Sequence, residues 1–311
     1  MIICSYPKVN ICLKITGFLG SYCEIASRFT LVKSENLYDT IEISHADSFR
    51  ISGNFDCKMQ DNTIFRAKEA LKDFLESKTK IAKSSFDSST TTANSSIVSE
   101  KSGLCSHERG NKTDSSIDEA SGKSPRFIAT RRICKELEFF HIAVDKQIPA
   151  LSGLGGGSSN AASYLIAMNE ILELNLEPKD LVQIARRVGA DVSFFVLGFS
   201  SANVFGVGEG VEFFNEKVPE LEIFMPHIQC STKAVYDEFR AMQKSGEAQF
   251  FSNKRTLFEL DSATLMQKYS IDFLNDLYTP ACRIYPQLRE FAKDGYFFSG
   301  SGSSFFKIKS K

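Results

Sequence analysis

The chain has 311 residues, of which 42% are hydrophobic and 24% are charged, and its formal net charge is -1. That length and composition are typical of a globular protein with two domains, and the near-neutral charge balance excludes non-specific attraction to nucleic acid or to an anionic membrane. No run approaches the roughly 18 consecutive apolar residues of a membrane-spanning helix, so we expect a cytoplasmic protein with reduced thiols and no membrane partner.

The first 76 residues have the patterns of a mixed α and β structure. Residues 9–15 and 40–43 are short segments rich in residues that favour strands. Residues 63–74 place Ile64, Ala67, Leu71 and Phe74 at helical spacing. We therefore expect strands followed by a helix.

From about residue 77 to residue 125 the sequence becomes rich in small polar residues and poor in apolar ones. Such a segment cannot bury enough surface to offset the entropy cost of ordering. We predict a disordered insertion with no catalytic role, and we expect ordered structure to resume near Phe127.

A strand, a glycine-rich loop and a helix are predicted next. Residues 139–144 resemble a strand, and residues 159–174 have an amphipathic helical pattern. A second helix at residues 180–188 ends at Gly189, and residues 191–197 are predicted to be a strand or a buried turn.

The last hundred residues form another mixed set. Residues 221–224 are predicted to be a strand, residues 231–242 a helix and residues 305–308 a final strand. We place an N-terminal domain at residues 1–210 and a C-terminal domain at residues 211–311.

The glycine-rich loop is the strongest local signal for chemistry. Several glycines allow backbone N–H groups to turn toward one point, and the following helix adds the positive end of its dipole, which suits a phosphate group. It is not a Walker A loop, and the near-match at Gly122-Lys123-Ser124 has Ile117 where that motif needs glycine. From glycine content alone, a flexible hinge or a close-packed turn remains an alternative. The candidate ATP-binding residues are Pro149, Ala150, Leu151, Ser152, Gly153, Leu154, Gly155, Gly156, Gly157, Ser158 and Ser159.

Two charged residues, Lys8 and Asp191, lie in apolar surroundings at the edges of predicted elements. A lone charge is costly there, so each is expected to have a partner. Taken separately, each is more often a member of a structural ion pair or a helix cap than a catalytic residue. The sequence by itself does not bring them together.

Two further features are less specific. The small-residue segment 298–305 could by itself be a hairpin turn. The eight cysteines and four histidines are scattered without a C-x-x-C pair, so no metal-ligating residues are predicted.

Together these segments resemble the GHMP kinase superfamily over nearly the whole chain except the polar insertion. The match rests on Pro7-Lys8-Val9-Asn10, on Gly153 to Ala162, on Gly189-Ala190-Asp191-Val192 with aromatic residues after it, and on Asn275-Asp276-Leu277 ahead of Ser-Gly-Ser-Gly. The resemblance implies a two-domain α+β fold, with an N-terminal domain like domain 2 of ribosomal protein S5, a C-terminal ferredoxin-like domain and the active site between them.

The resemblance also implies an activity, the ATP-dependent phosphorylation of an alcohol. The glycine loop would wrap the ATP phosphates with Mg²⁺ bridging them, Asp191 would accept the proton of the substrate hydroxyl, and Lys8 would keep Asp191 ionised. This agrees with the physics of phosphoryl transfer, in which positioning and electrostatics dominate.

Within the superfamily, the segments are most similar to a branch that serves isoprenoid synthesis and whose alcohol carries a cytidine diphosphate group. By that likeness Asn10 would contact the polyol, Tyr22 and Tyr236 would lie on either side of the cytosine ring, and Lys146 and Thr232 would lie near the bound ligands. Without it, each tyrosine is an ordinary half-buried core residue.

Two positions depart from the pattern of that branch. Cys23 stands where a histidine usually meets the cytosine edge, and a thiol is a poorer hydrogen-bond partner. Ser193 stands where proline is common, which should mainly loosen the turn after Asp191. The first departure bears on base selectivity, and neither removes a catalytic group.

Two alternatives stay open. The chain could be another superfamily kinase of the homoserine or mevalonate type, or a noncatalytic nucleotide-binding protein whose insertion recruits a partner. For the kinase we expect a monomer or a weak homodimer.

Overall fold

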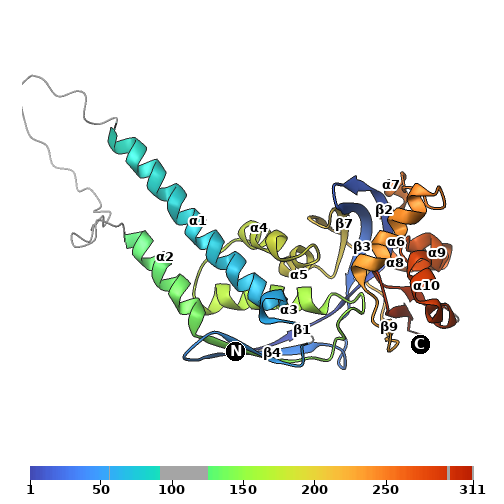
Figure 1. The fold of residues 1–311 in the computed structure, drawn as a ribbon, viewed down its shortest axis with the longest axis horizontal. Helices are drawn as coiled ribbons and strands as arrows, with labels where there is room; N and C mark the ends of the chain where they lie inside the picture. Colours follow the sequence, from blue (N-terminus) through green and yellow to red (C-terminus); the bar gives the residue numbers. More distant parts are fainter. Residues whose placement is uncertain (56, 92–124, 293–294, 310–311) are drawn as a thin grey trace, which may run out of the picture.

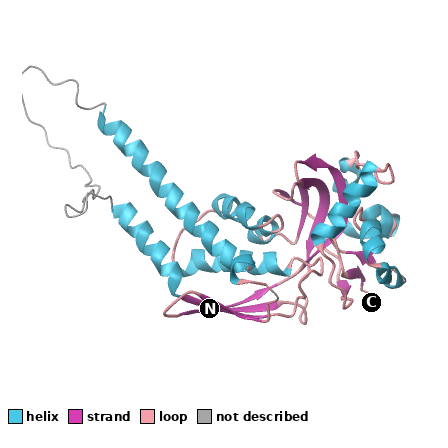
Figure 2. Cartoon of the chain, in the orientation of Figure 1, coloured by secondary structure: helices cyan, strands magenta, loops and turns pink. Residues whose placement is uncertain are grey.

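The computed structural model describes residues 1–55, 57–91, 125–292 and 295–309. Within these ranges the strands form three sheets, and helices cover them (Figures 1 and 2). The described helices include none that is long and apolar enough to cross a membrane.

The first sheet has the strand order β1-β4-β6-β5 and lies under a layer of helices (Figure 1). Its strands are antiparallel except for β5, which runs parallel to β6. Helix α3 contacts β1 and β4, and α1, α4 and α5 each pack on α3, with α4 also contacting α1 and α5. The elements are β1 (Ile2–Ser5), β4 (Asp39–His45), β5 (Arg50–Gly53), α1 (Thr63–Thr91), α2 (Pro125–Glu136), β6 (Phe140–Asp145), α3 (Gly156–Ile171), α4 (Pro178–Val188) and α5 (Val192–Leu197).

The second sheet is antiparallel, with the order β2-β3-β7-β8. Its long hairpin joins β2 (Lys8–Leu19) to β3 (Tyr22–Leu31). Strands β7 (Ser201–Gly206) and β8 (Gly210–Phe213) complete it.

The C-terminal part has a small antiparallel sheet, β10-β11-β9, with short helices around it. Three short 3₁₀ helices also occur in the described chain, at Met59–Asp61, Leu137–Phe139 and Pro286–Phe291. The elements of this part are β9 (Leu221–Phe224), α6 (Thr232–Lys244), α7 (Lys254–Glu259), α8 (Ser262–Lys268), α9 (Ile271–Leu274), α10 (Tyr278–Ile284), β10 (Phe297–Phe298) and β11 (Phe305–Ile308).

Hydrophobic packing is continuous across the predicted domain boundary at residues 210 and 211. Strand β8 spans that boundary and pairs with β7, so the second sheet extends to Phe213. One buried cluster contains both Leu13 and Phe305, and the other contains both Val9 and Phe306. The S5-like and ferredoxin-like descriptions of the two parts stay predictions.

The predicted elements are confirmed at most positions, and two need correction. Residues 191–197, expected to be a strand or buried turn, contain helix α5, which ends at Gly198 in a left-handed conformation. The insertion was predicted to begin near residue 77, but α1 continues as a helix to Thr91. The rest of that prediction, at residues 92–124, lies outside the described residues.

Candidate active site

The glycine-rich loop connects β6 to α3 and is held by close backbone contacts. Gly155 has φ 71° and is the N-cap residue of α3. Gly153 has φ 76°, and a Cβ atom there would lie 2.2 Å from the carbonyl oxygen of Ser299. The loop therefore packs directly against the small-residue segment 298–305, which connects the antiparallel strands β10 and β11.

Lys8 lies beneath this loop and reaches Asp191. Its Nζ atom is 3.3 Å from Oδ2 of Asp191, and the two side chains are 4% and 29% exposed. The same Nζ donates to Oδ1 of Asn10 at 2.6 Å and to the carbonyl oxygen of Gly153 at 3.3 Å. The backbone N–H of Lys8 also donates to the carbonyl oxygen of Leu154 at 2.9 Å. A buried ammonium group thus connects the glycine loop to a carboxylate that solvent can reach.

Asn10 is fixed from both sides. Its Nδ2 donates to Oγ of Ser27 at 2.9 Å, and its Oδ1 accepts from Lys8. Gly300 lies close by, since a Cβ atom there would be 3.2 Å from Oδ1 of Asn10. The predicted polyol-binding residue therefore lies next to the ion pair and next to the small-residue segment.

Asn275 holds that segment in place. Its Nδ2 donates to the carbonyl oxygens of Phe298 and Gly300, each at 2.9 Å. The adjacent Asp276 forms an ion pair with Lys14 and accepts from the backbone N–H of Ile15 at 2.8 Å. The Asn-Asp-Leu segment thus joins the C-terminal part to β2, close to Asn10 and the small-residue segment.

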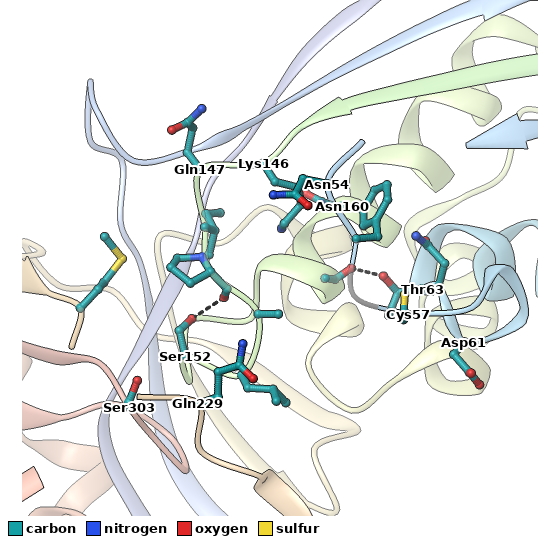
Figure 3. Close-up of a pocket in the computed structure, with 18 of the residues that line it drawn as sticks. Asn54, Cys57, Asp61, Thr63, Lys146, Gln147, Ser152, Asn160, Gln229 and Ser303 are labelled. Carbon is teal, nitrogen blue, oxygen red and sulfur yellow. Dashed lines mark hydrogen bonds between the residues drawn. The ribbon is translucent and has the colours of Figure 1, made fainter. Parts of the chain in front are cut away.

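A cavity of about 780 Å³ lies on another side of the glycine loop (Figure 3). Residues 149–152 and Gly157 contribute to its lining, and neither Lys8 nor Asp191 does. Its volume is within the range of small-molecule sites. The other lining residues are Asn54, Phe55, Cys57, Asp61, Asn62, Thr63, Ile64, Lys146, Gln147, Ile148, Asn160, Met225, Pro226, His227, Ile228, Gln229 and Ser303.

Asp39 organises the wall of this cavity, and the sequence analysis missed it. Its fully buried carboxylate accepts from Lys146 Nζ at 2.5 Å and from the backbone N–H groups of Gln147 and Ile148, each at 2.8 Å. Asn160 Nδ2 donates to it at 2.9 Å, and Figure 3 shows the Lys146 and Asn160 side chains next to each other. The only signal in the sequence was an acidic residue at the start of an apolar strand.

The ammonium group of Lys146 lies beside the first turn of α3. Its Nζ is 3.4 Å from the position of a Cβ on Gly156, and it lines the cavity. This position is on the cavity side of the loop, whereas Lys8 contacts the loop at Gly155, where a Cβ would lie 3.1 Å from its Cε. Lys146, predicted near the ligands and grouped with the alcohol-binding residues, is thus placed beside the glycine loop and the cavity.

Of the residues predicted to hold the cytosine ring, Tyr22 and Cys23 begin β3 at the hairpin turn, and Tyr236 lies on α6. The pKa of the Tyr236 hydroxyl is raised, first by burial and then by its proximity to Asp191 and Cys23. Tyr22, in contrast, is 67% exposed. Burial also raises the pKa of the Cys23 thiol, so it is neutral at neutral pH. Thr232 Oγ1 is 2.9 Å from Oγ of Ser301, beside the loop that contacts Gly153. Tyr236 is thus near the ion pair, and Tyr22 lies at the hairpin turn.

The oxygen groups beside the loop are compatible with Mg²⁺. The described residues contain no group of three or more His, Cys, Asp or Glu side chains that could cage a metal. Mg²⁺ is usually held by substrate phosphates, waters and only one or two protein oxygens, so such a cage is not needed. Ser158 Oγ is 3.9 Å from the position of a Cβ on Gly189, two residues before Asp191. The donor set fits a phosphate-bound Mg²⁺.

The described cysteines, which are all except Cys105, are free thiols. Cys12, Cys134, Cys230 and Cys282 are buried, and Cys57 lines the cavity.

Comparisons with known proteins agree on one group. A model of the GHMP kinases N terminal domain matches residues 126–199. A 4-diphosphocytidyl-2-C-methyl-D-erythritol kinase of Sulfurimonas denitrificans is 36% identical over 310 residues, which are 99% of this chain and 96% of that protein. The protein of the same name from Helicobacter pylori is 35% identical, covering 98% and 93% of the two chains.

Solved structures share the fold. A crystal structure of 4-(cytidine 5'-diphospho)-2C-methyl-D-erythritol kinase superposes with a TM-score of 0.63 at 22% identity, covering all of this chain and 90% of the other. The L. major mevalonate kinase in complex with R-mevalonate gives 0.52 at 11% identity, covering 100% and 87%.

Proposed function

The chain belongs to the family of 4-diphosphocytidyl-2-C-methyl-D-erythritol kinases, and on that premise we propose that it transfers the γ-phosphoryl group of ATP to the 2-hydroxyl group of this cytidylyl alcohol. The reaction belongs to the non-mevalonate route to isoprenoid precursors, and we place it in the cytoplasm. The observation that carries the proposal is the 3.3 Å pair of Lys8 and Asp191 directly against the glycine loop.

The nucleotide and the alcohol lie on different sides of the loop. The adenosine part of ATP occupies the cavity lined by Pro149, Lys146 and Asn160, and its phosphates follow the loop to the N-terminus of α3. The alcohol lies over Asn10 and Asp191. The γ-phosphate then faces the hydroxyl group at the point where Lys8 contacts Gly153.

Asp191 accepts the hydroxyl proton as the bond to phosphorus forms, and Lys8 offsets the negative charge that develops. Because the Lys8 side chain is 4% exposed and bonded to Asn10, its ammonium group is held in place before the substrate binds. Phosphoryl transfer depends mainly on such positioning and charge stabilisation.

Mg²⁺, when bound to the phosphates, neutralises charge on the transferring group. Ser158 and Asp191 supply the protein oxygens beside the loop that would hold it. The remaining steps depend on the side chains and backbone groups of this chain.

An ADP-release assay with a panel of alcohols tests the choice of substrate. We expect turnover with 4-diphosphocytidyl-2-C-methyl-D-erythritol and none with homoserine or mevalonate. Turnover of homoserine or mevalonate alone would assign the chain to another superfamily activity. ATP binding without transfer to any alcohol would indicate a noncatalytic nucleotide-binding protein.

A further inference from the structure

Arg240 lies beside the turn of the β2–β3 hairpin, away from Asp191, and has N–H groups that no described hydrogen bond uses. The guanidinium carbon of Arg240, on α6, lies 4.1 Å from the centre of the Phe18 ring, and its Nη2 donates to the carbonyl oxygen of Ser21 at 2.8 Å. Phe18 is itself braced by Phe250, with ring centres 4.9 Å apart. Arg240 is therefore fixed against the turn of the β2–β3 hairpin.

One face of α6 leads from the reacting groups to this arginine. Thr232, Tyr236 and Arg240 are four residues apart and so lie on the same face of the helix. Thr232 contacts Ser301, while Arg240 contacts the hairpin turn, and eight residues of helix separate them by about 12 Å. A long substrate with its hydroxyl at Asp191 would reach Arg240 with its other end.

The hairpin contributes aromatic surface at that end. Tyr22 is 67% exposed and pairs across the hairpin with Leu19, and Cys23 pairs with Phe18. A flat ring could stack on such a surface, and stacking by itself does not distinguish one base from another. Recognition of a particular base therefore needs a polar group beside the stack.

Arg240 is suited to that role and Cys23 is not. A guanidinium group has five N–H donors in a planar fork; the bond to Ser21 uses one, and the Cys23 side chain also contacts the group, so further donors remain for a base. Cytosine offers two neighbouring acceptors, O2 and N3, whereas uracil carries a hydrogen on N3. A fork of donors thus favours cytosine, while the neutral Cys23 thiol is a weak donor.

The structure assigns Arg240 a role in specificity: we propose that its guanidinium group reads the O2 and N3 acceptors of the cytosine ring of the substrate. This inference rests on the proposed function, because the relatives' name supplies the cytidylyl group. Asp237 is the nearby carboxylate on α6, and it is bonded to the exposed Lys233 at 2.5 Å. Lys233 therefore provides a matched control on the same helix.

The test compares Arg240→Ala, Arg240→Lys and the control Lys233→Ala with the wild-type enzyme. We measure kcat, both KM values and competitive inhibition by CDP and by UDP. Arg240→Ala should raise KM for the cytidylyl alcohol about tenfold or more, as expected for a lost bidentate contact to a base. Its kcat and its KM for ATP should stay at wild-type values, as should all parameters of Lys233→Ala.

The CDP-to-UDP inhibition ratio separates base recognition from simple charge attraction. The wild-type enzyme should prefer CDP, and both Arg240 variants should lose that preference, since lysine keeps the charge but not the planar fork. Retention of the preference by both Arg240 variants would overturn the inference, because another group would then read the base. Thermal unfolding of each variant confirms that the fold persists.

The outcome also distinguishes this inference from the proposed function. A wild-type enzyme that turns over the cytidylyl alcohol, with Arg240 variants that behave identically, contradicts the role of Arg240 alone. A wild-type enzyme without that turnover contradicts both.

Discussion

Gly153 and Gly155 allow the glycine-rich loop to pack closely against Ser299 and Lys8. Both have positive φ angles, and a side chain on Gly153 would collide with the Ser299 carbonyl oxygen. Gly246 has φ 80°, and no atom lies within 4 Å of the position that a Cβ would take there, so a substitution would bring backbone strain without the collision. Comparing Gly153 with Gly246 therefore separates the cost of the collision from the cost of backbone strain.

We predict that Gly153→Ala lowers both the melting temperature and kcat, because the loop must move away from the 298–305 segment. Gly246→Ala should cost only the roughly 1–2 kcal/mol of left-handed backbone strain at one residue, with unchanged kcat. Thermal unfolding and steady-state kinetics of both variants check this. Equal effects in the two variants would show that the packing against Ser299 is not needed.

Asp39 should act on ATP binding through Lys146. We predict that Asp39→Asn raises KM for ATP about tenfold, because an amide cannot satisfy four donors and leaves a buried ammonium group without its counter-charge. KM for the alcohol should change little. Asp145→Asn is the control. Asp145 directly precedes Lys146, is exposed, and accepts a hydrogen bond from Gln147 Nε2. A normal KM for ATP in Asp39→Asn would contradict the positioning role.

The sequence could identify single charged residues in apolar surroundings but not most of their partners. Lys8 and Asp191 stood out because a buried charge requires compensation, and the structure brings them together. Asp39 has no motif, and its importance depends on four donors from two distant segments. Arg240 was missed because an arginine on an amphipathic helix usually faces solvent.

At the scale of elements, α1 is fixed to α4 by Lys78 and Asp180, whose Nζ and Oδ1 atoms are 2.9 Å apart. The hydrogen bond from Lys78 holds the pKa of Asp180 below its ordinary value. Asp180 also accepts from the backbone N–H of Glu177 in the capping box of α4. Because its folded-state pKa is depressed, its stabilisation is present at neutral pH and is lost as the pH falls through that pKa.

We predict that Asp180→Asn destabilises the protein by up to about 1 kcal/mol at pH 7, because the amide has no charge to pair with Lys78. The difference from wild type should shrink as the pH falls, because the wild-type carboxylate is then protonated too. Melting temperatures measured from pH 7 down to the acid limit of the fold test this. A deficit that is constant at all pH values would mean that the charge of Asp180 plays no part.

Element prediction succeeded where apolar residues have a clear period and failed where they do not. Helix α4 has buried residues three and four positions apart, and it was predicted as a helix. The run Val192–Leu197 is apolar at all positions but Ser193, and such a run does not distinguish a buried helix from a buried strand. Its neighbours, Gly189 and Gly198, are compatible with both.

At the scale of the whole molecule, the residues assigned to the site all lie outside residues 92–124. We predict that removing this segment leaves kcat and both KM values unchanged, because no described contact of the loop, the ion pair or the cavity depends on it. Kinetics of a deletion variant with a wild-type circular dichroism spectrum provide the measurement. A folded but inactive variant would give the segment a functional role.

The division into domains at residues 210 and 211 stays a prediction, and the two regions pack on each other across it. Composition and motif order indicate two mixed regions, but the contacts of β2 with α8 and α9 are non-local and leave no sequence pattern. These contacts bring Asn275 to the loop and place Lys8, Asp191 and Ser299 around one point. The candidate active site is thus formed by residues from both halves of the chain.

The most direct test of phosphoryl transfer at this point is kcat for Asp191→Asn, measured with 4-diphosphocytidyl-2-C-methyl-D-erythritol alongside the dissociation constant for ATP. We predict that kcat falls by about two orders of magnitude or more, the scale of lost general-base help, while ATP binding is unchanged. A variant that turns over the alcohol at the wild-type rate would contradict the assignment of Asp191 as the base.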